Sequence, residues 1–291
     1  MKKIGFIGLG IMGSNIAYHL LEKYKNINII KRNSINTKKF IKKFANNGKI
    51  NLYNNHKELA ENSELIISCV ANDNDLKDIY LRKNKILDSV KKNTIIVDHT
   101  TASLNISIKL FKKFRSKQAF FYDAPVSGGE IGAQTGNLAI MVGGEKDKFK
   151  ALQECLDCYY KSMIYMGKSG NGQLTKMVNQ ICVASKIQGL AEGLNFAKKK
   201  NLNVEKLLEV IQNGAAQSWQ LENRSITMWN NKFNFGFMNK LMLKDLKILL
   251  NESNTSNIKL PITKRIKSFY TKLIKKGYSK EDTSNLIRLL K

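Results

Sequence analysis

Short apolar runs alternate with amphipathic segments through the first half of the chain. The runs predict strands at Ile4–Ile7, Ile27–Ile30, Leu65–Val70, Ile95–Asp98, Phe120–Ala124 and Ala139–Val142. Between several of them the apolar residues recur at helical spacing, as in Ser14–Lys25, Thr37–Asn46 and Leu76–Val90. Strands joined by helical crossovers form a parallel, doubly wound sheet, which binds ligands outside the carboxyl ends of its strands. The predicted fold class of this half is therefore α/β.

The pattern changes after about Gly170, where helical spacing replaces the apolar runs. Gln173–Lys200 predicts one long helix without proline, and three more helices are predicted at Val204–Gln212, Met238–Glu252 and Ile262–Lys276. No strand pattern of comparable quality follows. We therefore expect an all-helical C-terminal domain, with the boundary in the glycine-rich stretch Gly167–Gly172.

The first predicted strand leads directly into a glycine motif with the spacing G-x-G-x-x-G. Its glycines are Gly8, Gly10 and Gly13, and Leu9, Ile11 and Met12 lie between them. A strand before this motif and a helix after it form the context of a dinucleotide site, where the helix N-terminus binds the pyrophosphate. A secretory signal is the alternative, because two lysines precede apolar residues, but the glycines would interrupt its apolar helix.

Charge adds one possibility to this interpretation. The net charge is +26, and 43 of the 49 basic residues are lysines. The lysine pairs are scattered over both halves, and arginine, which most often reads bases, is scarce, so a nucleic-acid surface is the less favoured alternative. A positive field that attracts an anionic cofactor and a carboxylate substrate is the milder consequence. No run approaches the length of a membrane span, so we expect a cytoplasmic protein.

Cysteine usage is typical of a reducing compartment without a disulfide framework. Cys155 and Cys158 have the spacing of a redox or zinc half-site, but no second C-x-x-C accompanies them. Two cysteines near a helix end are the simpler interpretation, and we predict no metal.

The end of the second predicted strand bears on the choice of cofactor. Lys31, Arg32, Asn33 and Ser34 follow Ile30, and none of them is an acid. A carboxylate there would bind a free ribose 2′-hydroxyl, whereas Arg32 favours a 2′-phosphate. NADP is therefore preferred and NAD is the alternative, in which Arg32 is only another solvated cation.

Three further stretches combine residue types that carry chemistry. Asp123–Gly129 follows a strand and offers the Ser127 hydroxyl with Gly128 and Gly129 as a cradle for a carboxylate. On the long helix, Lys176 and Asn179 are three residues apart and share a face. Lys244 and Asp245 form the third stretch, which alone would be taken as solvated surface.

With the glycine motif, these stretches resemble the β-hydroxyacid dehydrogenase family in order and spacing along nearly the whole chain. The resemblance implies a Rossmann NAD(P)-binding domain at 1–166 and a helical domain for substrate and oligomerisation at 167–291. It assigns catalysis to Lys176 as acid/base with Asn179, and substrate-carboxylate binding to Ser127, Gly128 and Gly129. Cofactor contacts fall on Gly8–Gly13, Lys31–Asn33, Val70, Ala71, Thr101, Lys244 and Asp245.

The expected activity is reversible hydride transfer between NADP(H) or NAD(H) and a small 3-hydroxy acid or its semialdehyde. Family members assemble as homodimers or homotetramers. A proline common in the family's loop after the third strand is missing from Cys69–Asp73, and Trp219 is either a wall of the substrate pocket or a core residue. A dinucleotide-binding protein without catalysis, or one associated with nucleic acid, is the alternative function.

Overall fold

The computed structural model describes residues 3–31 and 34–290 and divides into two compact units, Met1–Lys176 and Met177–Lys291. The strands of unit 1 are β1 (Ile4–Ile7), β2 (Asn26–Ile30), β3 (Lys49–Tyr53), β4 (Leu65–Ser68), β5 (Ile95–Asp98), β6 (Phe120–Asp123), β7 (Val126–Ser127), β8 (Leu138–Gly143) and β9 (Tyr160–Gly167). Its helices are α1 (Ile11–Tyr24), α2 (Ile35–Phe44), α3 (His56–Glu61), α4 (Asp73–Tyr80), α5 (Ile86–Ser89), α6 (Leu104–Arg115), α7 (Gly129–Gln134) and α8 (Phe149–Leu156).

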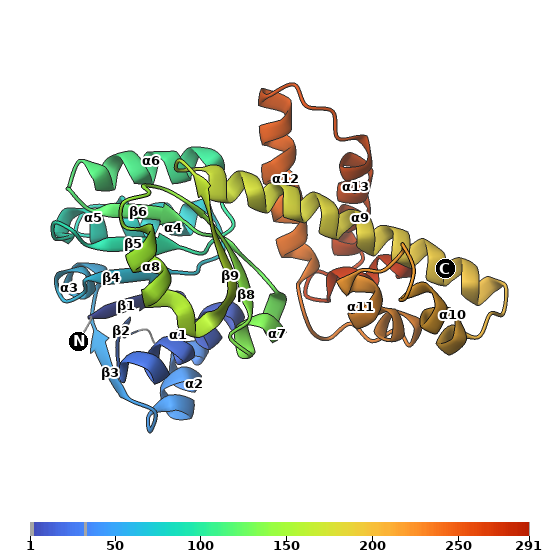
Figure 1. The fold of residues 1–291 in the computed structure, drawn as a ribbon, viewed down its shortest axis with the longest axis horizontal. Coiled ribbons are helices and arrows are strands. Elements are labelled where there is room, and N and C mark those ends of the chain that lie inside the picture. The colour runs from blue at the N-terminus through green and yellow to red at the C-terminus, as the bar shows by residue number, and fades with distance from the viewer. Residues whose placement is uncertain (1–2, 32–33, 291) are drawn as a thin grey trace. The chain divides into compact units, whose positions relative to one another are not determined.

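The sheet of unit 1 has the order β3-β2-β1-β4-β5-β6-β8-β7, and β9 pairs with β8. Neighbours from β3 to β6 are parallel, so their carboxyl ends meet at one edge (Figure 1). This confirms the predicted doubly wound sheet. The strand predicted at Ala139–Val142 differs, because β8 runs antiparallel to β6 and β7. The sheet is thus mostly parallel.

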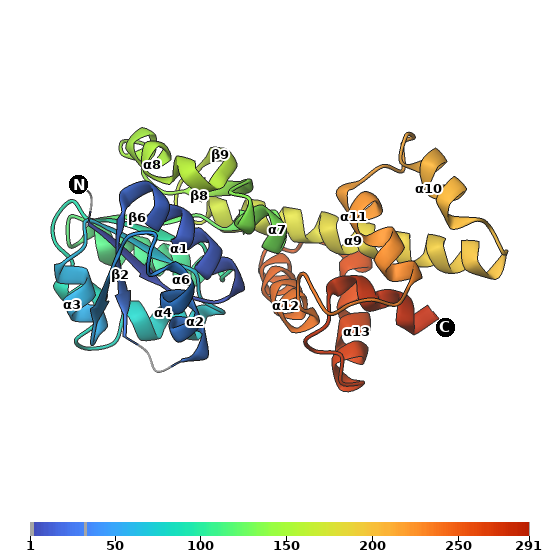
Figure 2. The same ribbon diagram turned by 90° about the horizontal axis from the view of Figure 1, so that it is seen from below.

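Successive residues of each central strand point to opposite faces of the sheet. Since all residues of β1 and β4 are buried, both faces are covered there. In β1, Ile4 and Phe6 pack in one cluster with Ile16 and Leu20 of α1. Ile7 points to the other face, where a second cluster contains residues of α3, α4 and α6. Figures 1 and 2 show these helices beside the strands. Because Ile4–Ile7 is a buried strand between β2 and β4, the signal-peptide alternative does not fit its structure.

Three local predictions need correction. β3 and β9 were not expected, since both are only partly buried and β3 alternates apolar with polar residues. The helix predicted at Leu76–Val90 is two helices, α4 and α5, separated at Asn84, which has a φ of 60° that helices do not use. The third strand ends at Ser68, so Val70 belongs to the loop that follows it.

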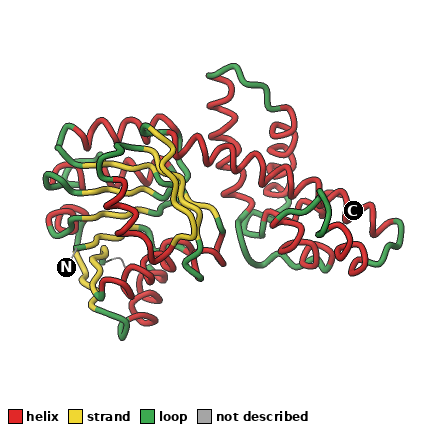
Figure 3. Tube along the Cα trace, viewed as in Figure 1, coloured by secondary structure: helices red, strands yellow, loops and turns green. Residues whose placement is uncertain are grey.

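Unit 2 continues the helix α9 (Asn171–Lys199) and adds α10 (Val204–Ile211), α11 (Trp219–Trp229), α12 (Asn239–Thr255), α13 (Pro261–Lys275) and a 3-10 helix (Thr283–Leu290). Figure 3 shows helices and no strand over residues 177–290, as predicted. Helix α11 is an addition to the prediction. The core gathers residues of α9, α11, α12 and α13, including Ile187, Met228, Leu246 and Tyr270.

Candidate active site

The three motif glycines of unit 1 meet different surroundings. A Cβ on Gly8, whose φ is 101°, would overlap the carbonyl oxygen of Cys69, and one on Gly13 would overlap that of Gly8. A Cβ on Gly10 would have no described atom within 4 Å. No side chain caps the start of α1 at Ile11, and its first turn has no acid. An open backbone at an uncapped helix N-terminus fits a pyrophosphate, so these residues fit a bound dinucleotide.

The predicted ribose-binding residues at the end of β2 are described only in part. Lys31 is exposed, and its backbone N–H donates to the Tyr53 carbonyl at 2.7 Å. Arg32 and Asn33 lie outside the described residues. The Ser34 hydroxyl accepts from the backbone N–H of Thr37 at 3.2 Å and caps α2. Ser34 therefore already has a structural partner.

Side chains hold the loop after β4, where the family's proline is missing. The backbone N–H of Val70 donates to Thr100 Oγ1 at 3.0 Å, and that of Ala71 donates to Asp75 Oδ2 at 3.1 Å. Asn72 caps α4 by accepting from two backbone N–H groups. The predicted contact Val70 is thus bonded to the loop after β5, which carries Thr101, and the predicted contact Ala71 is bonded to α4.

Ser127 and the two glycines after it lie at the start of α7. Ser127 belongs to β7, is half-buried and pairs in register with Ala139 of β8. Gly128 has a φ of 129° and Gly129 one of 62°, conformations that residues with a Cβ rarely adopt. A Cβ on Gly129 would have no described atom within 4 Å. The backbone beside Ser127 is therefore open at Gly129.

A buried histidine joins the loops after β5 and β6. The Nδ1 atom of His99 lies 2.6 Å from the Ala124 carbonyl oxygen, which only accepts, so Nδ1 carries the proton. Its Nε2 atom then accepts from the Tyr159 hydroxyl at 2.8 Å. Burial lowers the pKa of His99 to about 4, so the ring is neutral at physiological pH. His99 was not among the predicted site residues, because only the fold brings Ala124 and Tyr159 to it.

The carboxyl end of β6 meets the start of α9. Asp123 Oδ1 accepts from the backbone N–H of Gly170 at 2.7 Å, and Oδ2 accepts from that of Gln173 at 3.0 Å. Burial raises the pKa of Asp123 to about 7, although these donors act in the opposite direction. Lys176, the predicted acid/base, follows one turn later and is buried, with 8% of its surface exposed.

In unit 2 a chain of side chains joins three predicted residues. Asn179 Nδ2 donates to Gln180 Oε1 at 2.9 Å, and Gln180 Nε2 donates to Asp245 Oδ2 at 2.5 Å. Lys244 Nζ lies 3.2 Å from Asp245 Oδ1. Gln180 was missed by the sequence analysis, and its position next to Asn179 was the available signal.

Trp219 begins α11 and is 44% exposed, so the core alternative for this residue is wrong. The Arg224 guanidinium lies 4.9 Å from its ring centre and 5.0 Å from that of Phe235. Arg224 Nε in turn lies 3.3 Å from Oδ1 of Asp282, which is buried. The exposed ring is thereby held against an ion-paired arginine.

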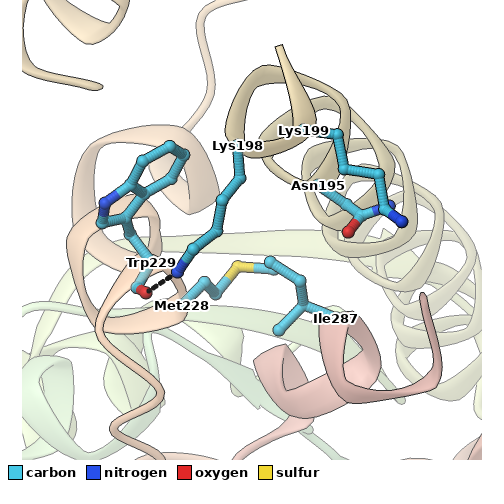
Figure 4. A pocket seen from close by; sticks show the side chains of 6 residues that line it. All are labelled: Asn195, Lys198, Lys199, Met228, Trp229 and Ile287. Carbon is cyan, nitrogen blue, oxygen red and sulfur yellow. Dashed lines mark hydrogen bonds between the residues drawn. The ribbon is translucent and has the colours of Figure 1, made fainter. Parts of the chain in front are cut away.

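A pocket of about 310 Å³ in unit 2 lies apart from these residues (Figure 4). Its lining is Asn195, Lys198, Lys199, Met228, Trp229 and Ile287. Lys198 points to Trp229, and its Nζ donates to the Trp229 carbonyl at 3.4 Å. None of the predicted site residues lines this pocket.

Cys155 and Cys158 form the C-x-x-C pair of the sequence. Cys155 is buried in α8 and donates to the Ala151 carbonyl, while burial raises the pKa of the Cys158 thiol to about 11. Over residues 3–31 and 34–290, no three histidine, cysteine or acidic side chains gather as a metal site would require. Within the same ranges, no helix combines the length and the apolarity of a membrane span.

Comparison with known proteins identifies the family. Residues 3–167 match the NAD-binding domain of 6-phosphogluconate dehydrogenase, and residues 170–290 match the NAD-binding domain of NADP-dependent 3-hydroxyisobutyrate dehydrogenase. The chain belongs to the 3-hydroxyisobutyrate dehydrogenase family. It is therefore an NAD(P)-dependent oxidoreductase, which confirms the resemblance noted in the sequence.

Relatives within the family cover the whole chain. An uncharacterized oxidoreductase of Shewanella frigidimarina is 38% identical over 100% of this chain and 98% of its own. Mouse mitochondrial 3-hydroxyisobutyrate dehydrogenase is 30% identical over 99% and 87%. The solved structure of Mycobacterium tuberculosis 3-hydroxyisobutyrate dehydrogenase with L-serine has the same fold, with a TM-score of 0.88, 23% identity and coverage of 100% and 99%.

Proposed function

We propose that this oxidoreductase transfers a hydride reversibly between NADP(H) and a small 3-hydroxy acid or its semialdehyde. Lys176 carries the proposal, because it is a buried lysine one turn beyond a helix start that is bonded to the carboxyl end of β6. Ligands of doubly wound sheets bind at that edge. The names of the mouse and M. tuberculosis relatives support the choice of substrate class.

The proposed roles follow from the chemistry of each group. The bound nicotinamide would supply the hydride acceptor or donor. Lys176 would take the proton of the substrate hydroxyl during oxidation and return it during reduction. Ser127, with the backbone of Gly128 and Gly129, would hold the substrate carboxylate, and Asn179 would hold the substrate close to Lys176.

The unit 2 residues have supporting roles in this proposal. Lys244 and Asp245 would approach the nicotinamide end of the cofactor, with the Asp245 carboxylate holding the Lys244 ammonium. Trp219 would form a wall of the substrate pocket, since its exposed ring is held by Arg224.

Turnover of defined substrates tests the proposal. The purified protein is assayed with small semialdehydes and NADPH, and with the matching 3-hydroxy acids and NADP⁺, by absorbance at 340 nm. We expect turnover that needs both a carboxylate and a hydroxyl or aldehyde at carbon 3, counting the carboxylate carbon as carbon 1. Turnover of neutral aldehydes at an equal kcat/KM, or no turnover in the whole panel, would contradict the proposal.

The preference for NADP rests on Arg32 and on the absence of an acid from residues 31–34. Loss of one charge-assisted contact costs about 1.5–3 kcal/mol, so Arg32→Ala should weaken NADPH binding about 10- to 150-fold. NADH binding should change little. Arg265→Ala, an exposed arginine of unit 2, is the control for charge alone. Equal kcat/KM for NADH and NADPH in the unaltered protein would show that Arg32 is only a solvated charge.

Location and assembly are proposals from the sequence. We propose a cytoplasmic homodimer or homotetramer, as the composition and the family resemblance imply. Light scattering of the purified protein gives the mass that decides between these assemblies.

A further inference from the structure

The first turn of α9 is held by the side chain of Asp123. The first N–H groups of a helix have no partner within the helix, and here one carboxylate accepts from the backbone on each side of the helix start. Asp123 uses Oδ1 for Gly170 and Oδ2 for Gln173, and the Ser169 hydroxyl donates to Oδ1 at 3.3 Å. Asp123 is fully buried, so water does not compete for these bonds.

Two glycines let the helix start approach the strand ends this closely. A Cβ on Gly172 would overlap the Asp123 carbonyl oxygen and lie 2.5 Å from that of Met141. A Cβ on Gly143 would lie 2.8 Å from the Gly172 nitrogen. The backbone of α9 therefore packs directly on the backbone of β6 and β8, without a side chain between them.

A second pair of hydrogen bonds connects the same turn to the loop after β5. The side chain of Gln173 donates through Nε2 to the Thr100 carbonyl at 2.8 Å and accepts at Oε1 from the Ala102 N–H at 3.1 Å. These bonds lie on either side of Thr101, a proposed cofactor contact. One turn of helix is thus bonded to the ends of two neighbouring strands.

We propose that Asp123 is a positioning residue for the proton transfer at Lys176. The backbone of Lys176 follows the anchored turn directly, so its place relative to the loops after β5 and β6 depends on the Asp123 carboxylate. This inference rests on the proposed role of Lys176. It assigns Asp123 a task in the rate of the chemical step and none in binding substrate or cofactor.

Asp123→Asn is the direct test, because it keeps the size and turns one acceptor into an NH₂ group that faces a backbone N–H. Misplacing a reacting group by about 1 Å costs about 100-fold in rate, so we expect kcat to fall at least about tenfold. KM and the NADPH dissociation constant should stay within about threefold. Rates are counted per bound NADPH, which excludes unfolded protein.

Leu152→Ala is the matched control, because Leu152 is fully buried in the core of unit 1 and lies outside the site. It should lower the melting temperature and leave kcat per bound NADPH unchanged. Should Asp123→Asn fail to fold, Ser169→Ala replaces it, since this variant removes the hydroxyl that donates to Asp123 Oδ1.

Hydrogen exchange separates this inference from the proposed function. The amides of Gly170 and Gln173 should exchange slowly in the unaltered protein and at least about tenfold faster in Asp123→Asn, whether or not a substrate is known. The positioning role is supported by faster exchange together with a kcat at least threefold lower. Unchanged exchange, or a kcat within threefold of the control, overturns it. Absence of turnover in the unaltered protein overturns the proposed function instead.

Discussion

Two buried carboxylates bind α9, and they do so in different ways. Asp123 in unit 1 accepts from backbone N–H groups, whereas Asp245 in unit 2 accepts from the side chain of Gln180 and forms an ion pair with Lys244. Backbone donors are fixed by the fold of the chain, so they determine where the helix starts. Side-chain donors belong to single residues. They therefore orient single groups, such as the Asn179 amide, and substitution can remove them.

This difference separates two kinds of constraint at one helix. In unit 1, the close contact of α9 with β6 and β8 requires that Gly143 and Gly172 have no side chains, because a Cβ on either would lie too close to the other segment. In unit 2, what matters is the presence of particular side chains, since Gln180 links Asn179 to Asp245. Adding a side chain at these glycines of unit 1 should therefore lower stability, whereas removing the Gln180 side chain of unit 2 should lower turnover.

The largest effect is expected where a side chain is added to the unit 1 contact. Gly172→Ala would place Cβ against backbone oxygens, and such overpacking lowers the free energy of unfolding by about 1–3 kcal/mol or more. Gly189→Ala on the same helix has no described atom within 4 Å of its Cβ, so it should raise that free energy by about 0.5–1 kcal/mol. Denaturant unfolding measures both, and equal effects would refute the close backbone contact.

A substitution at the unit 2 contact should lower stability less than Gly172→Ala does. It should lower the rate of turnover more. Gln180→Leu removes a hydrogen bond to a buried carboxylate, and we expect kcat to fall about tenfold, equivalent to about 1.4 kcal/mol. Gln188→Leu is the matched control, because Gln188 is a buried glutamine of α9 that donates to Glu192. If both variants keep the same kcat, the chain from Asn179 to Lys244 has no part in turnover.

A third test is the part of the pH dependence of stability that Asp123 should cause. Its pKa is raised from 3.8 to about 7, so its contribution to stability is complete below about pH 4 and is lost as the pH rises through 7. The free energy of unfolding of the unaltered protein minus that of Asp123→Asn should therefore fall between pH 4 and 7, by at most about 1.4 kcal/mol per pH unit. A difference that rises over this range would contradict the raised pKa.

The candidate site residues proposed from the sequence are those with a local pattern. The glycine motif has fixed spacing, and Lys176 and Asn179 share a helix face whatever the rest of the chain does. The sheet was predicted from apolar strands such as Ile4–Ile7, whereas β3 and β9 were missed because both are edge strands that are only partly buried.

Long-range partners account for what the sequence could not predict. Gln173 is bonded to residues about 70 positions earlier, and Gln180 to one 65 positions later. His99 is polar, yet the fold buries it between hydrogen bonds to Ala124 and Tyr159, and burial keeps it neutral by lowering its pKa. Such roles depend on contacts between segments distant along the chain, which no local pattern records.

The most direct test of the account is the rate of turnover after removal of the Lys176 ammonium group. With the best substrate of the panel, Lys176→Ala should lower kcat at least about 100-fold, the usual scale of acid–base catalysis, with NADPH binding within about twofold of the unaltered protein. Lys186→Ala, an exposed lysine of the same helix, should leave kcat unchanged. A kcat for Lys176→Ala within threefold of that of Lys186→Ala would contradict the assignment of proton transfer to Lys176.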